Sequence, residues 1–310
     1  MSARVDLLAD EGRAASADEF FRHPGFLDAE GVTHTLVIET DTGRCAIPLV
    51  VRDVPGTSDR DAVSPYGYPG ATTEGDAPDA REVDLSGTGL VTAFIRDGLG
   101  APSLAGGTAR GRVMIYDPAL PRTVSKSYRR DVRRNEQDGY STEVLDGRDV
   151  DDEVLEGFAA AYAETMSHVG AATRYEFSPK YLRTCLDFER SWLAVTRGPD
   201  GDVAAAELLV GSDGVLHSYL AGTRTAHRMR SPGKNATVAT LDLADRLAVR
   251  LNHGGGLTPG DGIEASKRSY TNTEASFVTH ELVCDPARYA ALSSGDIETG
   301  YFPSYRAPAR

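Results

Sequence analysis

The chain of 310 residues is poor in cysteine and has only three, Cys45, Cys185 and Cys284. They lie far apart and form no C-x-x-C pair, which excludes a disulfide framework and a zinc site built on paired cysteines. A sparse, odd set of thiols is typical of buried, reduced cysteines in the cytoplasm. We therefore expect a cytoplasmic protein with no metal site and no tightly bound cofactor.

Long hydrophobic runs are also missing. No segment approaches the ~20 apolar residues that cross a bilayer, and the opening residues, MSARVDLLADEGRAAS, lack the apolar stretch of a signal peptide. Hydrophobic residues still make up 40% of the chain, enough for a packed core, and its length favours two domains. We expect a soluble protein that does not insert into membranes; the sequence leaves its oligomeric state open.

Positive charge is in deficit, with 33 Lys and Arg against 46 Asp and Glu and a net charge of −13. This balance argues against a surface that coats nucleic acid broadly. One predicted helix, from Ser127 to Gly139, nevertheless concentrates basic residues. They are Lys126, Arg129, Arg130, Arg133 and Arg134. These side chains either contact the phosphates of an RNA or form a solvated face paired with Asp131 and Glu136.

Hydrophobic periodicity predicts strands over 33–40, 45–54 and 111–118, and a short helix over 89–100. From about residue 150 the pattern predicts a helix, a second helix, three antiparallel strands, a helix and a strand. The predicted segments are 149–171, 178–188, 191–223, 235–252 and 276–285. This α+β order resembles that of a GNAT-type acyltransferase domain.

Glycine is concentrated just before Lys267. The stretch GGGLTPGDGIEASKRS, residues 254–269, holds five of the 32 glycines within nine residues. Because glycine loses the most conformational entropy on folding, such a run indicates either close backbone approach or a flexible surface loop.

Five segments taken together resemble the Fem-type (FemABX-like) branch of the GNAT superfamily. They are SPYGYPG (64–70), SYRRDVRRNEQDGYSTEV (127–144), FAAAYAETMSHVGAATRYEFSPKYL (158–182), LNHGGGLTPGDGIEASKRSY (251–270) and YFPSYR (301–306). The resemblance implies an α+β fold of two GNAT-like subdomains, with mixed and antiparallel sheets flanked by helices. It implies a first subdomain over 1–148, to which the tail 286–310 returns, and a second over 149–285.

The same resemblance implies an enzyme that transfers an amino acid from aminoacyl-tRNA to an amine, forming an amide. It assigns Lys267 to stabilising the oxyanion of the tetrahedral intermediate. The sequence departs from the family pattern at Ser266, where Phe is usual, and at His168, where Arg is common. The coiled-coil arm of some cell-wall members is absent, which favours a small amine acceptor in a biosynthetic pathway over a peptidyl one.

The remaining candidate residues fall into two groups. Tyrosines with apolar bodies and hydroxyl tips suit an acceptor cleft, and histidines suit a general base. The acceptor candidates are Tyr66, Tyr68, His168, Tyr175 and Tyr219, with His217 as a second candidate base. In RSPGKNAT, residues 230–237, a helix start suits an anion, so Arg230, Gly233 and Lys234 are donor candidates.

Two alternatives to a tRNA-dependent enzyme remain open: an enzyme that uses acyl-CoA, and a protein without catalytic activity. The RSPGKN segment partly matches the GNAT pyrophosphate signature, so the donor is either aminoacyl-tRNA or acyl-CoA. Asn235 fills a position that is small in that signature, and its side chain is expected to crowd a phosphate. The second alternative is a non-catalytic binding module that retains the fold.

Overall fold

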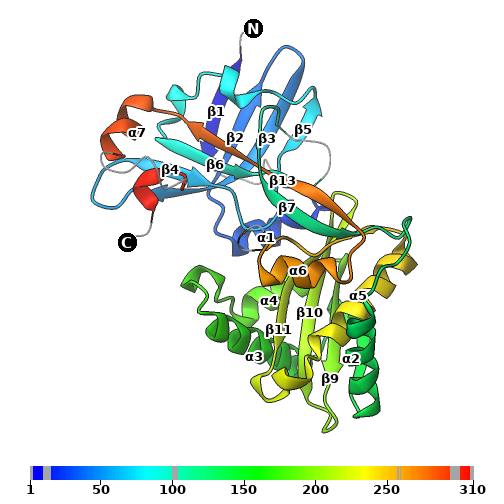
Figure 1. Cartoon of the computed structure of the whole chain (residues 1–310). Coiled ribbons are helices and arrows are strands. Elements are labelled where there is room, and N and C mark those ends of the chain that lie inside the picture. The colour runs from blue at the N-terminus through cyan, green and yellow to red at the C-terminus, as the bar shows by residue number, and fades with distance from the viewer. Residues whose placement is uncertain are drawn as a thin grey trace. The chain divides into compact units, whose positions relative to one another are not determined.

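The computed structural model describes residues 3–9, 15–99, 104–256, 258, 260–293 and 301–307. The chain forms two compact units (Figure 1). The first consists of Met1–Arg110 and Ser276–Arg310, and the second of Gly111–Ala275. These units divide the chain at other positions than the expected subdomains 1–148 and 149–285. Of the expected returning tail, residues 294–300 and 308–310 lie outside the described residues.

The first unit is built on a mixed sheet in the order β1-β2-β3-β4-β6-β13, with β5 paired to β3. Neighbours run antiparallel except β4 and β6, which are parallel. The strands are β1 Arg4–Ala9, β2 His34–Glu39, β3 Gly43–Asp53, β4 Arg60–Val63, β5 Thr72–Gly75, β6 Thr92–Arg96 and β13 Thr273–Val283, and the helices are α1 Pro24–Ala29 and α7 Pro286–Leu292.

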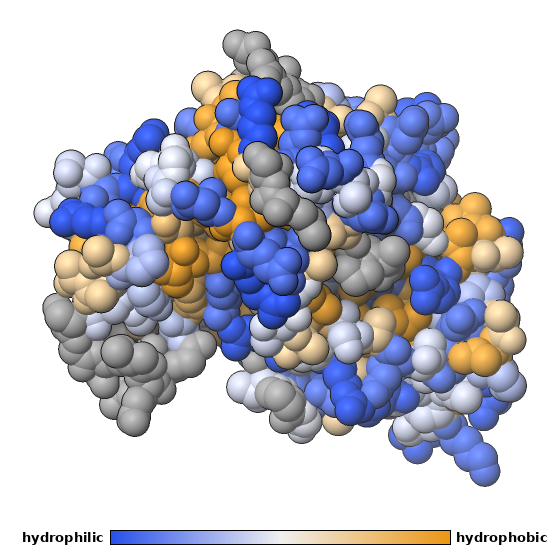
Figure 2. All heavy atoms as spheres, turned by 90° about the horizontal axis from the view of Figure 1, so that it is seen from above, coloured by the Kyte–Doolittle hydropathy of each residue, from blue (hydrophilic) through white to orange (hydrophobic). Residues whose placement is uncertain are grey.

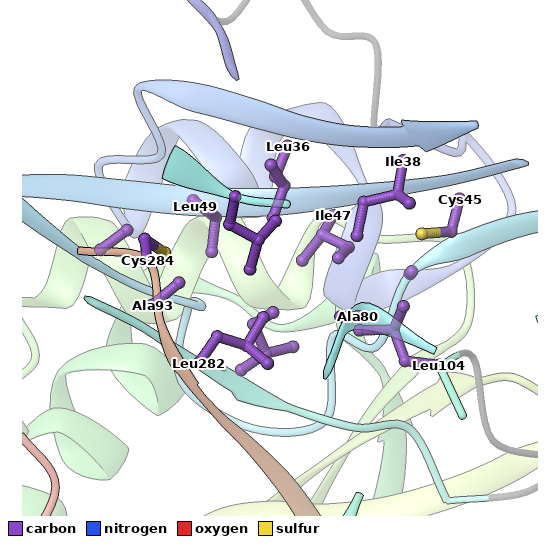
Figure 3. Packing of buried hydrophobic residues seen from close by; sticks show 14 of the residues in the cluster. Leu36, Ile38, Cys45, Ile47, Leu49, Ala80, Ala93, Leu104, Leu282 and Cys284 are labelled. Carbon is purple, nitrogen blue, oxygen red and sulfur yellow. The ribbon is translucent and has the colours of Figure 1, made fainter. Parts of the chain in front are cut away.

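Aliphatic side chains from these strands form the core of the first unit (Figure 3). Leu36 and Ile38 on β2 pack against Ile47 and Leu49 on β3, and Leu282 on β13 joins the same cluster. Consecutive residues in the middle of β2 and β3 are buried, so both faces of these strands are covered: Leu36 and Ile38 face this cluster, and Val37 packs with Ala46 in another. All three cysteines are buried, as predicted.

The helix predicted over 89–100 is wrong, because the structure has strand β6 there. Ala93 and Ile95 point into the core of the first unit, and β6 pairs with β4 and with β13. Two flanking strands supply backbone hydrogen bonds that a short isolated helix could not match. Tertiary pairing therefore outweighs the local propensity of this segment.

The second unit has the strand order β7-β12-β11-β10-β9-β8, in which β11 and β12 are parallel and the other neighbouring strands are antiparallel. The strands are β7 Thr108–Tyr116, β8 Ser141–Asp146, β9 Ser191–Arg197, β10 Val203–Ser212, β11 Val215–Thr223 and β12 Arg250–Asn252. The helices are α2 Lys126–Gln137, α3 Asp152–Val169, α4 Pro179–Leu186, α5 Gly233–Leu247 and α6 Gly262–Arg268.

Short 3₁₀ helices join these elements. They are η1 Phe20–Arg22, η2 Ala80–Glu82, η3 Ser86–Thr88, η4 Gly147–Asp149, η5 Thr173–Tyr175, η6 Thr225–Arg230 and η8 Ser304–Arg306. Helices α2 and α5 lie side by side on one face of β9–β11, and α3 and α4 cover the other (Figure 1). The mixed sheets flanked by helices confirm the predicted fold class.

Local signals placed several of these elements correctly. The three-strand meander of β9, β10 and β11 matches the prediction over 191–223, and Ser178 caps α4 with Pro179 at its first position. Helix α2 begins at Lys126, one residue before the predicted start at Ser127, and Ser125 caps it. Tyr128 and Val132 of α2 pack in one core with α5, β9, β10 and β11, which is why α2 belongs to the second unit.

Figure 2 shows one face of the molecule coloured by hydropathy. The face seen in Figure 2 is mostly hydrophilic, and hydrophobic residues reach it only in separate patches. No helix in the described part of the chain combines the length and apolar character that a membrane span requires.

A buried carboxylate anchors the C-terminal segment to the first unit. The fully buried Asp61 side chain accepts hydrogen bonds from Arg52 Nε at 3.0 Å, from Arg306 Nη2 at 3.1 Å and from Tyr305 OH at 3.2 Å. The Tyr305 hydroxyl also lies 2.8 Å from Thr92 Oγ1. Two guanidinium groups compensate the cost of burying one carboxylate, so this cluster fixes η8 on β4.

We expect Asp61→Asn to destabilise the first unit by ~3 kcal/mol or more, because it leaves two arginines without their buried counter-ion. Hydrogen exchange of the β3 and β4 amides measures this loss. Glu74→Gln is the matched control: its exposed pair with Arg44, at 3.9 Å, contributes at most about 1 kcal/mol. Equal exchange rates in the two variants would contradict the assignment.

Candidate active site

A cavity of about 360 Å³ opens within the second unit, where β10 and β11 meet the first turn of α5. Helices α2, α3 and α6, the 3₁₀ helix η6 and the residue after it complete its wall. The lining residues are Tyr128, Thr165, His168, Ala206, Glu207, Ala221, Gly222, Thr223, Arg228, Ser231, Gly233, Lys234, Ala236, Thr237, Ser266 and Tyr270. The structure thus brings His168, Gly233 and Lys234, three of the candidates predicted from sequence, to one cavity.

Glu207 is the carboxylate of this cavity, and it is 4% exposed. It lies in the middle of β10, opposite Ala221 of β11 and Ala194 of β9. Thr237 Oγ1 on α5 donates to Glu207 Oε2 at 3.2 Å. Burial raises the pKa of the Glu207 carboxyl, while hydrogen bonds from Ser218 and Thr237 and the charge of Lys267 act in the opposite direction.

Two other titratable groups share this environment. Burial lowers the pKa of His253 to about 3, helped by the positive charge of Lys267, so the imidazole is neutral near pH 7. His253 Nδ1 lies 3.7 Å from Glu207 Oε1. Its Nε2 is buried and has no hydrogen-bond partner in the described part of the chain. Burial also lowers the pKa of Lys267, and the negative charges of Glu207 and Asp261 oppose that shift.

Aromatic rings enclose the buried part of the cavity. The rings of Tyr128 and Tyr270 are 5.2 Å apart, and Tyr270 meets His253 edge-on at 4.9 Å. The ammonium of Lys234 lies 5.3 Å from the centre of the Tyr128 ring, within the range of a cation–π interaction. Lys234 Nζ also donates to Asp131 Oδ2 at 2.6 Å.

The glycine run before Lys267 is explained by close approach. A Cβ on Gly255 would lie 2.6 Å from the Arg112 carbonyl oxygen, and one on Gly256 would lie 2.4 Å from Asp261 Oδ1. Asp261 caps α6, accepting from Glu264 N at 2.8 Å. Lys267 Nζ donates to the Gly255 carbonyl at 2.6 Å. Leu257 and Pro259 of this run lie outside the described residues.

The predicted basic residues of α2 form one surface. Lys126, Arg129, Arg130, Arg133 and Arg134, with Gln137, line a groove of about 570 Å³, which we call the basic groove. All six side chains are exposed. Tyr128, on another face of the same helix, lines the cavity. Arg230 lies at the end of this helix and pairs with Asp138 at 2.6 Å.

Asn235 does not crowd the cavity. Its side chain is 4% exposed and turns toward α2, where Asn135 Nδ2 donates to Asn235 Oδ1 at 2.8 Å. Asn235 is not among the described residues that line the cavity. The expectation that Asn235 crowds a phosphate at the start of α5 is therefore wrong. The side-chain amide of Asn235 instead joins α5 to α2.

The remaining candidates lie elsewhere. Tyr66 and Tyr68 belong to the first unit, where Tyr68 packs edge-on against Phe277 at 5.6 Å. In the second unit, the Tyr175 carbonyl accepts from Tyr162, and the hydroxyls of Tyr219 and Tyr181 are 2.5 Å apart.

Neither Tyr175 nor Tyr219 is among the described residues that line the cavity. The same holds for His217, which is buried, lies 3.1 Å from Asn252 Nδ2 and has its pKa lowered by burial to about 4.

Sequence reasoning missed Glu207, Thr237 and His253. Glu207 is the single charged residue in the apolar strand AAAELLVG, residues 204–211, and an acid in a buried strand is a recognisable signal. Thr237 and His253 give no such signal, because their roles arise from packing against Glu207. Ser266, where the family usually has Phe, lines the cavity.

Residues 122–256 match the family described as an acetyltransferase (GNAT) domain, and this range contains most of the cavity. No curated protein sequence matches the chain. Residues 122–256, which lie in the second unit, are therefore similar to an acetyltransferase (GNAT) domain.

Solved structures extend the likeness to nearly the whole chain. The crystal structure of FemX has a TM-score of 0.61 at 11% identity, covering 92% of this chain and 99% of that chain. The C-terminal domain of a putative lysylphosphatidylglycerol synthetase from Agrobacterium fabrum has a TM-score of 0.56 at 14% identity, covering 89% and 90%. L-PGS from Bacillus licheniformis has a TM-score of 0.51 at 11% identity, covering 84% and 90%. The resemblance to the Fem-like branch is confirmed as a likeness of fold.

We expect Gly256→Ala to loosen α6, because the added Cβ displaces the Asp261 carboxylate that caps it, at a cost of ~1 kcal/mol. Hydrogen exchange of the α6 amides measures the effect. Gly262→Ala is the matched control, since a Cβ at Gly262 meets no atom within 4 Å. If Gly256→Ala leaves α6 as protected as in the parent, the glycine run does not position Lys267.

Proposed function

We propose that the chain transfers an aminoacyl group from aminoacyl-tRNA to a small amine acceptor in a biosynthetic pathway. The observation that carries the proposal is that α2 contributes to two surfaces at once. Its basic groove holds five cations, and its Tyr128 lines the cavity. A polyanion bound along α2 would bring its reactive end to that cavity.

The number of cations favours tRNA as the donor. Five exposed cations on one helix suit a nucleic-acid backbone that presents a phosphate at every nucleotide. Arg130 is partly neutralised by Asp131, at 3.4 Å, in an exposed pair that contributes little. The basic groove therefore keeps its positive charge despite the net charge of −13.

In the proposed reaction the acceptor amine attacks the ester carbonyl carbon. A C–N bond forms, the C–O bond to the terminal ribose breaks, and the ribose oxygen leaves as a hydroxyl. Lys267 is not among the described residues that line the cavity, but its charge acts on Glu207 in the cavity wall. As its family resemblance implies, Lys267 stabilises the oxyanion with a second N–H donor, besides the one that bonds to the Gly255 carbonyl. His168, which lines the cavity, takes the amine proton and passes it to the leaving ribose oxygen.

Acyl-CoA is the alternative donor, and one observation favours it. Because Asn235 turns toward Asn135, the first turn of α5 with Gly233 and Lys234 leaves room for a pyrophosphate. We prefer tRNA because the basic groove has more cations than a pyrophosphate requires.

An assay of amide formation with each donor distinguishes aminoacyl-tRNA from acyl-CoA. We expect amide formation when candidate amines are supplied with charged tRNA, and its loss after ribonuclease treatment. Arg129→Glu with Arg133→Glu should weaken tRNA binding and flatten its dependence on salt, since fewer counter-ions are released. Arg246→Glu with Arg250→Glu reverses the same charge at exposed positions outside the basic groove and is the control.

Three outcomes would count against the proposal. Product from acyl-CoA that persists after ribonuclease, with none from charged tRNA, establishes the alternative donor. Equal salt slopes for the two double variants remove α2 from tRNA binding. A chain that binds donors but forms no product with either one is a binding module.

We expect Lys267→Ala to lower turnover by ~10²–10³, the usual cost of removing one oxyanion donor, with a much smaller change in donor affinity. Single-turnover kinetics and a donor titration measure the two effects. Lys180→Ala removes an exposed lysine of the same unit and should leave both unchanged. Near-normal turnover in Lys267→Ala would exclude the lysine from the mechanism.

A further inference from the structure

The cavity differs in charge between its two ends. Its buried end contains the carboxyl of Glu207, the hydroxyl of Thr237 and the rings of Tyr128 and Tyr270, all 8% exposed or less. Its more exposed end is lined by Arg228, Ser231 and Lys234 at the start of α5. A ligand that fills the cavity thus meets an acidic, aromatic end and a basic end.

The buried end has the chemistry that binds an ammonium group. A carboxylate supplies the counter-charge, and aromatic faces attract cations without donating hydrogen bonds to them. The structure already shows one such contact, since the Lys234 ammonium lies over the Tyr128 ring. Thr237 holds Glu207 Oε2, which fixes the carboxyl in the cavity wall.

The basic end has the chemistry that binds a phosphate. Gly233 and Lys234 begin a helix of 15 residues, and Arg228 lies beside them in the lining. The N-terminus of a helix and the guanidinium of Arg228 favour an anion, and the ammonium of Lys234, which is paired with Asp131 at 2.6 Å, lies beside them. An aminoacyl ester at the end of a nucleic acid carries an ammonium on one side of its carbonyl and a phosphate on the other.

We propose that the cavity selects donors by the free α-ammonium group of their acyl chain, which Glu207, Tyr128 and Tyr270 bind, while Arg228 and Lys234 bind the phosphate of the terminal nucleotide. This inference rests on the proposed function and names the group of the aminoacyl donor that the cavity recognises. It gives Glu207 a role in binding the donor, next to the reacting carbonyl.

The electrostatics of Glu207 are consistent with this role. Burial disfavours its charged form more than the charge of Lys267 and the hydrogen bonds from Ser218 and Thr237 favour it. An ammonium bound beside the carboxyl adds a second counter-charge and favours the carboxylate further. Lys267 is not among the described residues that line the cavity, and its ammonium bonds to the Gly255 carbonyl. The lysine therefore leaves the Glu207 carboxyl open to the ligand.

The experiment compares two donors that differ in one group. The first is tRNA charged with labelled amino acids, and the second is the same preparation after nitrous acid has converted each amino group to a hydroxyl. We expect the parent chain to prefer the aminoacyl donor by ~10-fold or more in kcat/KM. Glu207→Gln keeps the size and the Thr237 contact but not the charge, so the ratio should fall close to one.

Glu143→Gln is the matched control, because this exposed carboxylate of the same unit pairs with Arg197 outside the cavity. It should keep the parental ratio. tRNA treated with nitrous acid before charging controls for damage to bases. Equal rates for the two donors in the parent, or an unchanged ratio in Glu207→Gln, would overturn the ammonium site and leave aminoacyl transfer standing. No product from either donor, with product from acyl-CoA, would overturn the proposed function itself.

Discussion

The buried carboxyl of Glu207 constrains the whole second unit. A carboxylate in the middle of a strand, 4% exposed, is stable only if neighbouring elements compensate its lost hydration. Helix α5 supplies Thr237 and β11 supplies Ser218, while α6 supplies the charge of Lys267. Elements far apart in the chain are thus held around one acid, and the cavity forms beside it.

The glycine run and the short helix α6 follow from that constraint. Lys267 must approach a buried acid from a helix of only seven residues, which has little stability of its own. Asp261 caps that helix, and glycine at position 256 makes room for the capping carboxylate. The Gly255 carbonyl then accepts from the lysine. The absence of a side chain at Gly255 and Gly256 therefore lets polar groups approach the backbone closely.

Helix α2 connects this interior to the surface. Its inner face places Tyr128 in the cavity and joins Asn135 to Asn235, while its outer residues form the basic groove. A ligand along the groove and a ligand in the cavity would contact the same rigid element. This explains how an acidic chain with a net charge of −13 can present a local surface for a polyanion.

The sequence alone determined features that depend on neighbouring residues. Periodicity and caps predicted the meander from β9 to β11 and helix α4, and the spacing of arginines predicted the basic helix. Only the tertiary structure decided the rest. Residues 89–100 are a strand because β4 and β13 pair with β6. The Asn235 side chain turns toward α2 because it accepts a hydrogen bond from Asn135. Glu207, Thr237 and His253 come together only when β10, α5 and the segment after β12 pack against one another. Hydrogen bonds and burial between distant segments leave no periodic trace in the sequence, so the chain's own pattern could not reveal them.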